Sequence, residues 1–184
     1  SGTLGQGVSK IYLDKENASS QTKVLTKIVS TVLGNKRLPM LIIDSKSVIK
    51  DRNIFTARGA GIIGFSIFGK DVTYALDDNM KLDIDRVKDF SQRHKNEKIF
   101  IFGFTSIIWK HFVRYILDNR IKPSQLDGTM IHGGGWKKLN DLKIDNTLFK
   151  KSIFDAFGLK NVINYYDIKI VKVMTSVLYF SQSC

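Results

Sequence analysis

The segment Lys98-Ile99-Phe100-Ile101-Phe102-Gly103-Phe104 is the clearest strand signal in the chain, and it runs directly into Thr105 to Leu117. Ile99 to Phe102 is apolar at every position, which is typical of a strand covered on both faces. Thr105 to Leu117 carries apolar residues at helical spacing. A doubly covered strand followed at once by a helix is the repeating unit of a parallel α/β sheet.

The rest of the chain continues this alternation of apolar runs and amphipathic segments. Further strands are predicted over Met40 to Ile43, which ends at Asp44, and over Val72 to Leu76, Thr129 to His132 and Val162 to Tyr166. Further helices are predicted over Gln21 to Leu33, Asp51 to Ala57, Asp83 to His94 and Asp145 to Phe157. We therefore expect an α/β fold with a mainly parallel sheet and helices on both faces.

Ligands of such sheets bind beyond the carboxyl ends of the strands. This rule selects three places in the sequence: the loop after Phe104, the loop at Gly133 and the segment after Tyr166.

Length and composition are those of one ordinary globular domain. The chain has 184 residues, of which 43% are hydrophobic. Cys184 is the only cysteine, which excludes an internal disulfide and a cysteine-rich zinc site. We find neither a signal-peptide pattern nor an apolar run of about 18 residues, and so expect a cytoplasmic protein without a membrane span.

The chain is basic, with 29 Lys and Arg against 17 Asp and Glu and a net charge of +12. Its lysines are scattered, and the only dense groups are Lys137-Lys138 and Lys150-Lys151. No RNA-binding, zinc-finger or basic-zipper signature accompanies them. Solvated surface lysines are therefore the favoured interpretation, with a nucleic-acid-binding domain as the less favoured alternative.

The first ten residues combine glycines, hydroxyls and one lysine: Ser1-Gly2-Thr3-Leu4-Gly5-Gln6-Gly7-Val8-Ser9-Lys10. Glycines let a ligand approach the main chain, whose N–H groups can then face a phosphate. The run is not a Walker A loop, because it lacks the G-x-x-x-x-G-K-[ST] pattern.

A second glycine-rich run is His132-Gly133-Gly134-Gly135-Trp136-Lys137-Lys138, at the end of a predicted strand. Three glycines allow a flat ligand to lie against the backbone, Trp136 can stack on it, and the lysines can meet a phosphate or carboxylate. The alternative is a glycine-rich turn beside a core tryptophan. We favour the ligand role, because three glycines are conformationally costly.

Other motifs are weaker. The run Gly59-Ala60-Gly61-Ile62-Ile63-Gly64 matches G-x-G-x-x-G, but no strand directly precedes it, and we interpret it and the following apolar residues as a close-packed or strand-forming stretch. His94 is predicted to be a solvated surface residue and His111 a structural one. Cys184 has no activating base nearby in the sequence.

The order of the motifs resembles one known family. The segments that carry the resemblance are Ser1-Gly2-Thr3-Leu4-Gly5-Gln6-Gly7-Val8-Ser9-Lys10-Ile11-Tyr12-Leu13-Asp14, Phe102-Gly103-Phe104-Thr105-Ser106-Ile107-Ile108-Trp109, and His132-Gly133-Gly134-Gly135-Trp136-Lys137-Lys138. Together they resemble the acyl-protein synthetases, the fatty-acid ligases of bacterial luminescence, within the adenylate-forming superfamily of acyl-CoA synthetases and luciferases. The resemblance covers residues 1 to about 166.

The resemblance implies ATP- and Mg²⁺-dependent activation of a fatty acid as an acyl adenylate, followed by transfer to a protein thiol. An acyl-acceptor protein or a reductase would be the partner. The residues implied in phosphate binding are Ser1, Gly2, Thr3, Gly5 and Lys10. Those implied in adenine binding are His132, Gly133, Gly134, Gly135, Trp136, Tyr165 and Tyr166. Those implied at the acyl site are Phe104, Thr105, Ser106 and Trp109. The resemblance assigns no catalytic residue.

The chain departs from the family pattern after Tyr166. The pattern calls for Tyr-Gly-x-x-Glu, whereas Tyr166 is followed by Asp167-Ile168-Lys169-Ile170. We therefore expect residues 1–166 to be a partial large domain of an adenylate-forming enzyme and residues 167–184 to be a divergent tail from a truncated or frame-disrupted gene. The alternative function is an inactive remnant or a module that binds nucleotide or acyl ligand without turnover.

Overall fold

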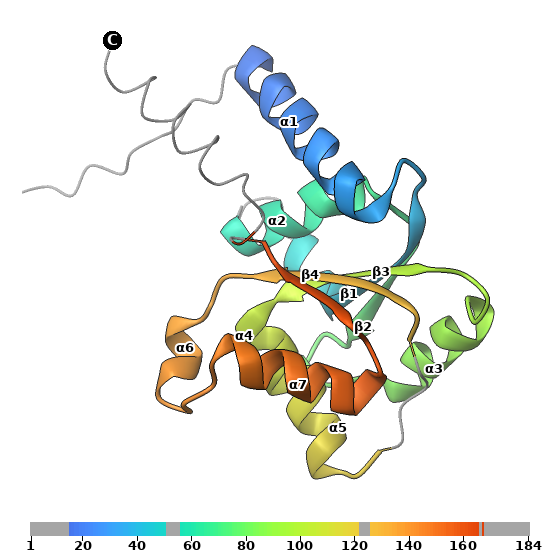
Figure 1. The fold of residues 1–184 in the computed structure, drawn as a ribbon, viewed down its shortest axis with the longest axis vertical. Helices are drawn as coiled ribbons and strands as arrows, with labels where there is room; N and C mark the ends of the chain where they lie inside the picture. Colours follow the sequence, from blue (N-terminus) through green and yellow to red (C-terminus); the bar gives the residue numbers. More distant parts are fainter. Residues whose placement is uncertain (1–14, 51–55, 122–125, 166, 168–184) are drawn as a thin grey trace, which may run out of the picture.

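A five-stranded sheet forms the centre of the computed structural model, which describes residues 15–50, 56–121, 126–165 and 167. Every neighbouring pair of strands is parallel, in the order β2-β1-β3-β4-β5 (Figure 1). The strands are β1 (Leu38–Ser45), β2 (Gly69–Leu76), β3 (Ile99–Phe104), β4 (Gly128–Gly133) and β5 (Asn161–Asn164). The predicted α/β fold with a parallel sheet is confirmed.

Helices connect the strands. The α-helices are α1 (Lys15–Leu33), α2 (Ala57–Ser66), α3 (Ile84–Arg93), α4 (Thr105–Ile107), α5 (Arg114–Asp118), α6 (Lys137–Asn140) and α7 (Asn146–Phe157). A 3₁₀ turn, η1 (Lys46–Ile49), follows β1, and a π-helical segment, η2 (Ile108–Val113), joins α4 to α5.

Local signals explain where several helices begin and end. Asp83 caps α3 and Asp145 caps α7, each side chain accepting a hydrogen bond from a backbone N–H in the first turn. Helix α7 ends at Gly158, whose φ of 66° is the left-handed conformation that glycine adopts at helix ends.

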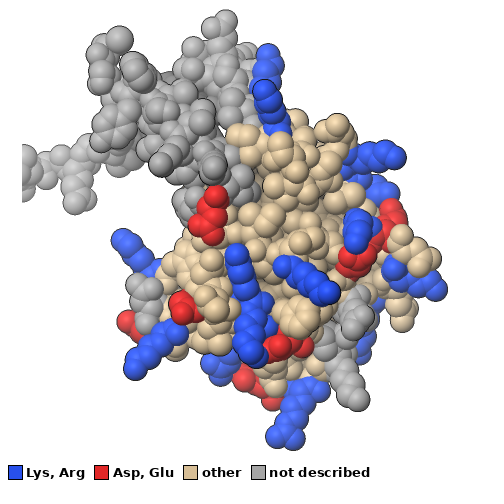
Figure 2. Space-filling model, viewed as in Figure 1, with Lys and Arg blue, Asp and Glu red and all other residues tan. Residues whose placement is uncertain are grey.

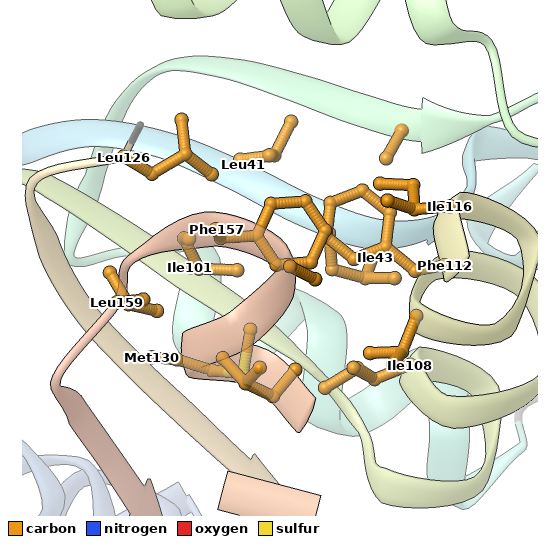
Figure 3. Packing of buried hydrophobic residues seen from close by; sticks show 14 of the residues in the cluster. Leu41, Ile43, Ile101, Ile108, Phe112, Ile116, Leu126, Met130, Phe157 and Leu159 are labelled. Carbon is orange, nitrogen blue, oxygen red and sulfur yellow. The ribbon is translucent and has the colours of Figure 1, made fainter. Parts of the chain in front are cut away.

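Alternate residues of the strands face two separate cores, and the helices divide between them (Figure 1). Leu41, Ile43 and Ile101 face a core built with α3, η2, α5 and α7. Met40 and Ile42 face the other core, built with α1 and α2. In the first core the rings of Phe112 and Phe157 stack with centroids 4.5 Å apart (Figure 3). The sheet is thus covered on both faces, as the continuous apolar run from Ile99 to Phe102 predicted.

The glycine-rich segment before β2 differs from the prediction. Of the two interpretations, close packing is confirmed by the burial of Ile62 and Phe65, and a strand is wrong, because Gly59 to Gly64 lies inside α2. Thr56 caps this helix by accepting a hydrogen bond from the N–H of Gly59 at 3.0 Å. Ile62 and Phe65 bury its inner face, and burial at that spacing outweighs the low helix propensity of three glycines.

Charged side chains are spread over the surface. On the face shown in Figure 2, lysines and arginines are interspersed with acidic residues. Several form exposed ion pairs, such as Lys98 with Asp127 and Lys151 with Asp155. This distribution agrees with solvated surface lysines. Among the helices of the described residues, none has the length and apolar character that a membrane crossing requires.

Candidate ligand site at the carboxyl edge of the sheet

The order of the strands reverses between β1 and β3. The chain passes from β1 to β2 on one side of β1, and then to β3 on the other side. In open parallel sheets such a reversal opens a crevice at the carboxyl ends of the strands. The residues at this edge are Asp44 and Ser45 of β1, Phe104 of β3, and His132 and Gly133 of β4.

The glycine turn after β4 packs against the junction of β3 and α4. Gly134 and Gly135 have φ values of 73° and 78°, which favour glycine. A Cβ atom at Gly134 would lie 3.2 Å from the Phe104 ring, and one at Gly135 would overlap the Ser106 side chain. The structure therefore brings together Gly134, Gly135, Phe104 and Ser106, which the sequence placed in two separate motifs.

His132 lies beneath this turn and is fully buried. Its Nδ1 atom lies 3.0 Å from the Thr105 hydroxyl, and its ring centroid lies 4.6 Å from that of Phe149. Its Nε2 atom has no hydrogen-bond partner among the described residues. Burial, and secondarily the charge of Lys150, lowers the pKa of His132 to about 3, so the imidazole is neutral at pH 7.

The two tryptophans predicted at the site pack against the same phenylalanine. The Trp136 and Phe149 rings lie edge to face at 5.7 Å, and the Trp109 and Phe149 rings lie 6.4 Å apart. The Nε1 atom of Trp109 is buried without a partner among the described residues. Trp136 therefore packs against the core, as the alternative interpretation of a core tryptophan expected. It is also partly exposed beside the turn.

The residues predicted to bind adenine are only partly brought together. The N–H of Tyr165 donates to the carbonyl of His132 at 2.6 Å, but the Tyr165 ring packs against Phe65 of α2, with centroids 5.6 Å apart. Tyr165 thus belongs to the α1–α2 side and His132 to the α7 side of the sheet. Tyr166 and the predicted phosphate-binding residues, which are Ser1, Gly2, Thr3, Gly5 and Lys10, lie outside the described residues.

A cavity of about 420 Å³, which we call the edge pocket, opens at this edge. Its apolar lining comes from Met80, Ile107, Trp109, Leu139 and Leu142. Its polar lining comes from Arg58, Ser106, Lys110 and His111. Of the residues predicted at the acyl site, Ser106 and Trp109 line the pocket. Thr105 is buried against His132, and Phe104 packs against Phe102.

Sequence reasoning missed the ion pair beside this pocket. Arg58 donates through Nε to Asp44 Oδ2 at 2.7 Å and through Nη2 to Asp44 Oδ1. The Asp44 side chain is 0% exposed, whereas that of Arg58 is 34% exposed. Asp44 marked the end of a buried strand, but the two residues lie fourteen positions apart and match no motif. Their pairing depends on how α2 packs against β1.

His111 lines the edge pocket as a neutral side chain. Burial, and secondarily the charge of Lys110, lowers its pKa, while a backbone hydrogen bond at Met80 opposes this effect. Among the described residues, the positive charges that line the pocket at pH 7 are therefore those of Arg58 and Lys110, and none of these lining residues is a carboxylate.

A larger hollow, of about 550 Å³, lies at the opposite edge of the sheet. Leu38, Ile99, Gly128 and Asn161, which begin four of the strands, contribute to its wall. Because ligands of parallel sheets bind beyond the carboxyl ends of the strands, we identify the smaller edge pocket as the candidate site.

The parallel sheet, the helices on both faces and the strand reversal define a doubly wound α/β fold, and the edge pocket is its candidate ligand site. The chain belongs to the acyl-protein synthetase family, since the family model described as "Acyl-protein synthetase, LuxE" matches residues 1–179. The matched range extends past Tyr166 into the segment expected to diverge. No match was found among the curated proteins or among the solved structures.

Proposed function

We propose that this chain binds a fatty acid and ATP as an acyl-protein synthetase, an ATP-dependent ligase that activates the fatty acid and transfers it to a protein thiol. The observation that carries the proposal is the edge pocket, in a chain that the family model matches over residues 1–179. Its apolar walls suit an acyl chain. Its two cations suit a carboxylate, since no acidic residue is among the described residues that line it.

The nucleotide is proposed to lie beside the glycine turn. Gly133 and Gly134 are partly exposed and Gly135 is exposed, so a flat ring can approach the main chain there. The turn adjoins Ser106, which also lines the edge pocket, and this contact would hold the adenine and acyl ligands near each other. Ser1, Gly2, Thr3, Gly5 and Lys10 are proposed to contact the phosphates through N–H groups, hydroxyls and one cation.

The described residues do not supply a magnesium site by themselves. Among them, no group of three or more His, Cys, Asp or Glu side chains could hold a metal ion. The proposal therefore assigns no residue to Mg²⁺ and includes no step at the metal.

The proposed chemistry has two steps. A carboxylate oxygen of the fatty acid bonds to the α-phosphorus of ATP, and the bond to the β-phosphate oxygen breaks, so that pyrophosphate leaves with the electron pair. A thiol sulfur of the acceptor protein then bonds to the acyl carbon, the thiol proton is released and AMP leaves. The protein's contribution to the first step is to position the ligands and stabilise charge, rather than to provide a covalent nucleophile.

The test is fatty-acid-dependent release of pyrophosphate by the purified 184-residue chain, with acyl adenylate measured in parallel. The proposal predicts equal amounts of the two products with decanoate and neither product with decanol, which lacks the carboxylate. Absence of decanoate binding, or of ATP binding, would contradict the proposal.

One alternative is a module that binds nucleotide or acyl ligand without turnover. It is favoured by the sequence after Tyr166, where Asp167 and Ile170 stand in place of the glycine and the glutamate of the expected Gly-x-x-Glu. Binding of ATP and decanoate without release of pyrophosphate would support this alternative over the ligase.

A further inference from the structure

Arg58 occupies an unusual place for a cation, because it stands in the first turn of α2. The helix begins at Ala57, and its first turn contains no acidic residue. The helix dipole disfavours a positive charge at this end, and a lysine or arginine is better placed near the C-terminus. Another interaction must therefore hold the Arg58 side chain here.

That interaction is the pair with Asp44. Two N–H groups of the guanidinium are directed at the two oxygens of a single carboxylate, and a third contacts Met80 Sδ at 3.2 Å. Asp44 is itself fixed, since Oδ1 also accepts the N–H of Ser45 at 2.7 Å. A guanidinium has five N–H groups, so this arrangement fixes its plane and leaves two of them outside these three contacts.

The charges around the pocket match one negative group. Arg58 and Lys110 contribute two positive charges, and Asp44, paired behind Arg58, contributes one negative charge. These three groups together carry one net positive charge, which is complementary to the single negative charge of a monocarboxylate. The N-terminal end of α2, beside Arg58, favours an anion for the same electrostatic reason that it disfavours a cation.

We infer that Arg58 binds the carboxylate of the fatty acid in the edge pocket and thereby selects acids over uncharged analogues of the same chain length. Asp44 is the positioning residue that fixes the guanidinium. This inference rests on the proposed function, since that proposal places the acyl ligand in the pocket.

Calorimetric titration of the full 184-residue chain with decanoate and with decanol tests the inference. Removing Arg58 alone would leave a buried carboxylate unpaired and could unfold the protein. The main variant is therefore the double substitution Asp44→Asn with Arg58→Met. A charged hydrogen bond of ordinary strength predicts that its decanoate affinity falls by about 10- to 100-fold. Its decanol affinity is expected to change by less than about twofold, because the apolar walls are unchanged.

Three further variants separate recognition from folding. Arg58→Lys keeps the charge but loses the planar pair of hydrogen bonds, so the preference for decanoate should fall only partly. Lys151→Met removes an exposed lysine on α7, whose partner is Asp155, and should leave the preference unchanged. Asp44→Asn alone keeps Arg58 but loses the carboxylate that fixes its guanidinium, so the preference for decanoate should weaken.

Three results would overturn the inference. Equal affinity of the unmodified protein for decanoate and decanol would show that the pocket binds the alkyl chain without recognising the carboxylate. A preference retained by the double variant, or lost in Lys110→Met instead, would assign recognition to another group. If the unmodified chain bound neither ligand, the proposed function would fail together with the inference.

Discussion

His132 belongs to a motif that is predicted to bind a ligand, and its side chain has a structural role in the fold. It begins the glycine motif, but its ring lies in the core between Thr105 and Phe149. The hydrogen bond to Thr105 joins the ends of β4 and β3, which fixes the base on which the glycine turn rests. A buried Nε2 atom without a partner among the described residues is costly, and a bound water or ligand atom would relieve that cost.

The buried imidazole makes stability depend on pH. The pKa of His132 is lowered to about 3 in the folded chain, whereas an unfolded histidine has a pKa near 6.5. Below about pH 6.5 the unfolded state binds the proton and the folded state does not, so stability is complete above that pH and falls as the pH decreases toward 3. The loss is at most about 1.4 kcal/mol per pH unit.

Urea unfolding at pH 7 and pH 5 measures this contribution, with His132→Gln as the comparison. The variant retains hydrogen-bonding atoms but cannot titrate, so its free energy of unfolding should fall less between the two pH values. Identical losses in the two proteins would show that His132 is not buried as described.

The ion pair between Asp44 and Arg58, beside the edge pocket, could not be predicted from the sequence. Each residue is unremarkable in its own segment, and the pairing arises only when the fold brings the first turn of α2 to the end of β1. Ser106 and Trp109, which the family resemblance places at the acyl site, line the edge pocket, and the loop that they occupy was selected because it follows the strongest strand. Local sequence thus indicates positions along a strand, but not partners from a different element.

At the scale of elements, strand and helix signals agreed with the structure where the apolar period was clear. The helix predicted over Asp83 to His94 is observed as Ile84–Arg93, and the strand predicted over Lys98 to Phe104 as Ile99–Phe104. Helix α2 was not predicted, because its glycines are poor helix formers and made the helical spacing of Ile62 and Phe65 less evident. The π-helical segment after Thr105 has no local sequence signature and depends on packing.

The glycine turn and α2 provide a matched pair of glycine substitutions. Gly135→Ala places a Cβ atom in a left-handed backbone and against Ser106, and should lower the free energy of unfolding by about 1–3 kcal/mol. Gly64→Ala lies inside α2 with open space around its Cβ position, and should raise it by about 0.5–1 kcal/mol.

Urea denaturation of the two alanine variants gives both values. We expect the two changes in the free energy of unfolding to have opposite signs, because the same added methyl group is strained in the turn and favourable in the helix. A Gly135→Ala variant as stable as the unmodified chain would contradict the close contact between the turn and Ser106.

At the scale of the molecule, the alternation of strands and helices was sufficient to predict the parallel sheet with helices on both faces. The order β2-β1-β3-β4-β5 was not predicted, since strand neighbours depend on contacts far apart in the sequence. This order puts the reversal between β1 and β3, so one of the three places selected from the sequence, the loop after Phe104, borders it. The end of β1, with Asp44, is the part of the edge that was overlooked.

The two hollows at opposite edges of the sheet make the central claim directly testable. We would label the full chain with ¹⁵N and follow its backbone amides by NMR during titration with decanoate. The account predicts saturable shifts in the amides of Arg58, Met80, Ser106 and Lys110, which line the edge pocket. Shifts confined to Gly34, Lys36, Gly128 and Thr129 would place the ligand in the hollow at the amino ends of the strands and contradict the account.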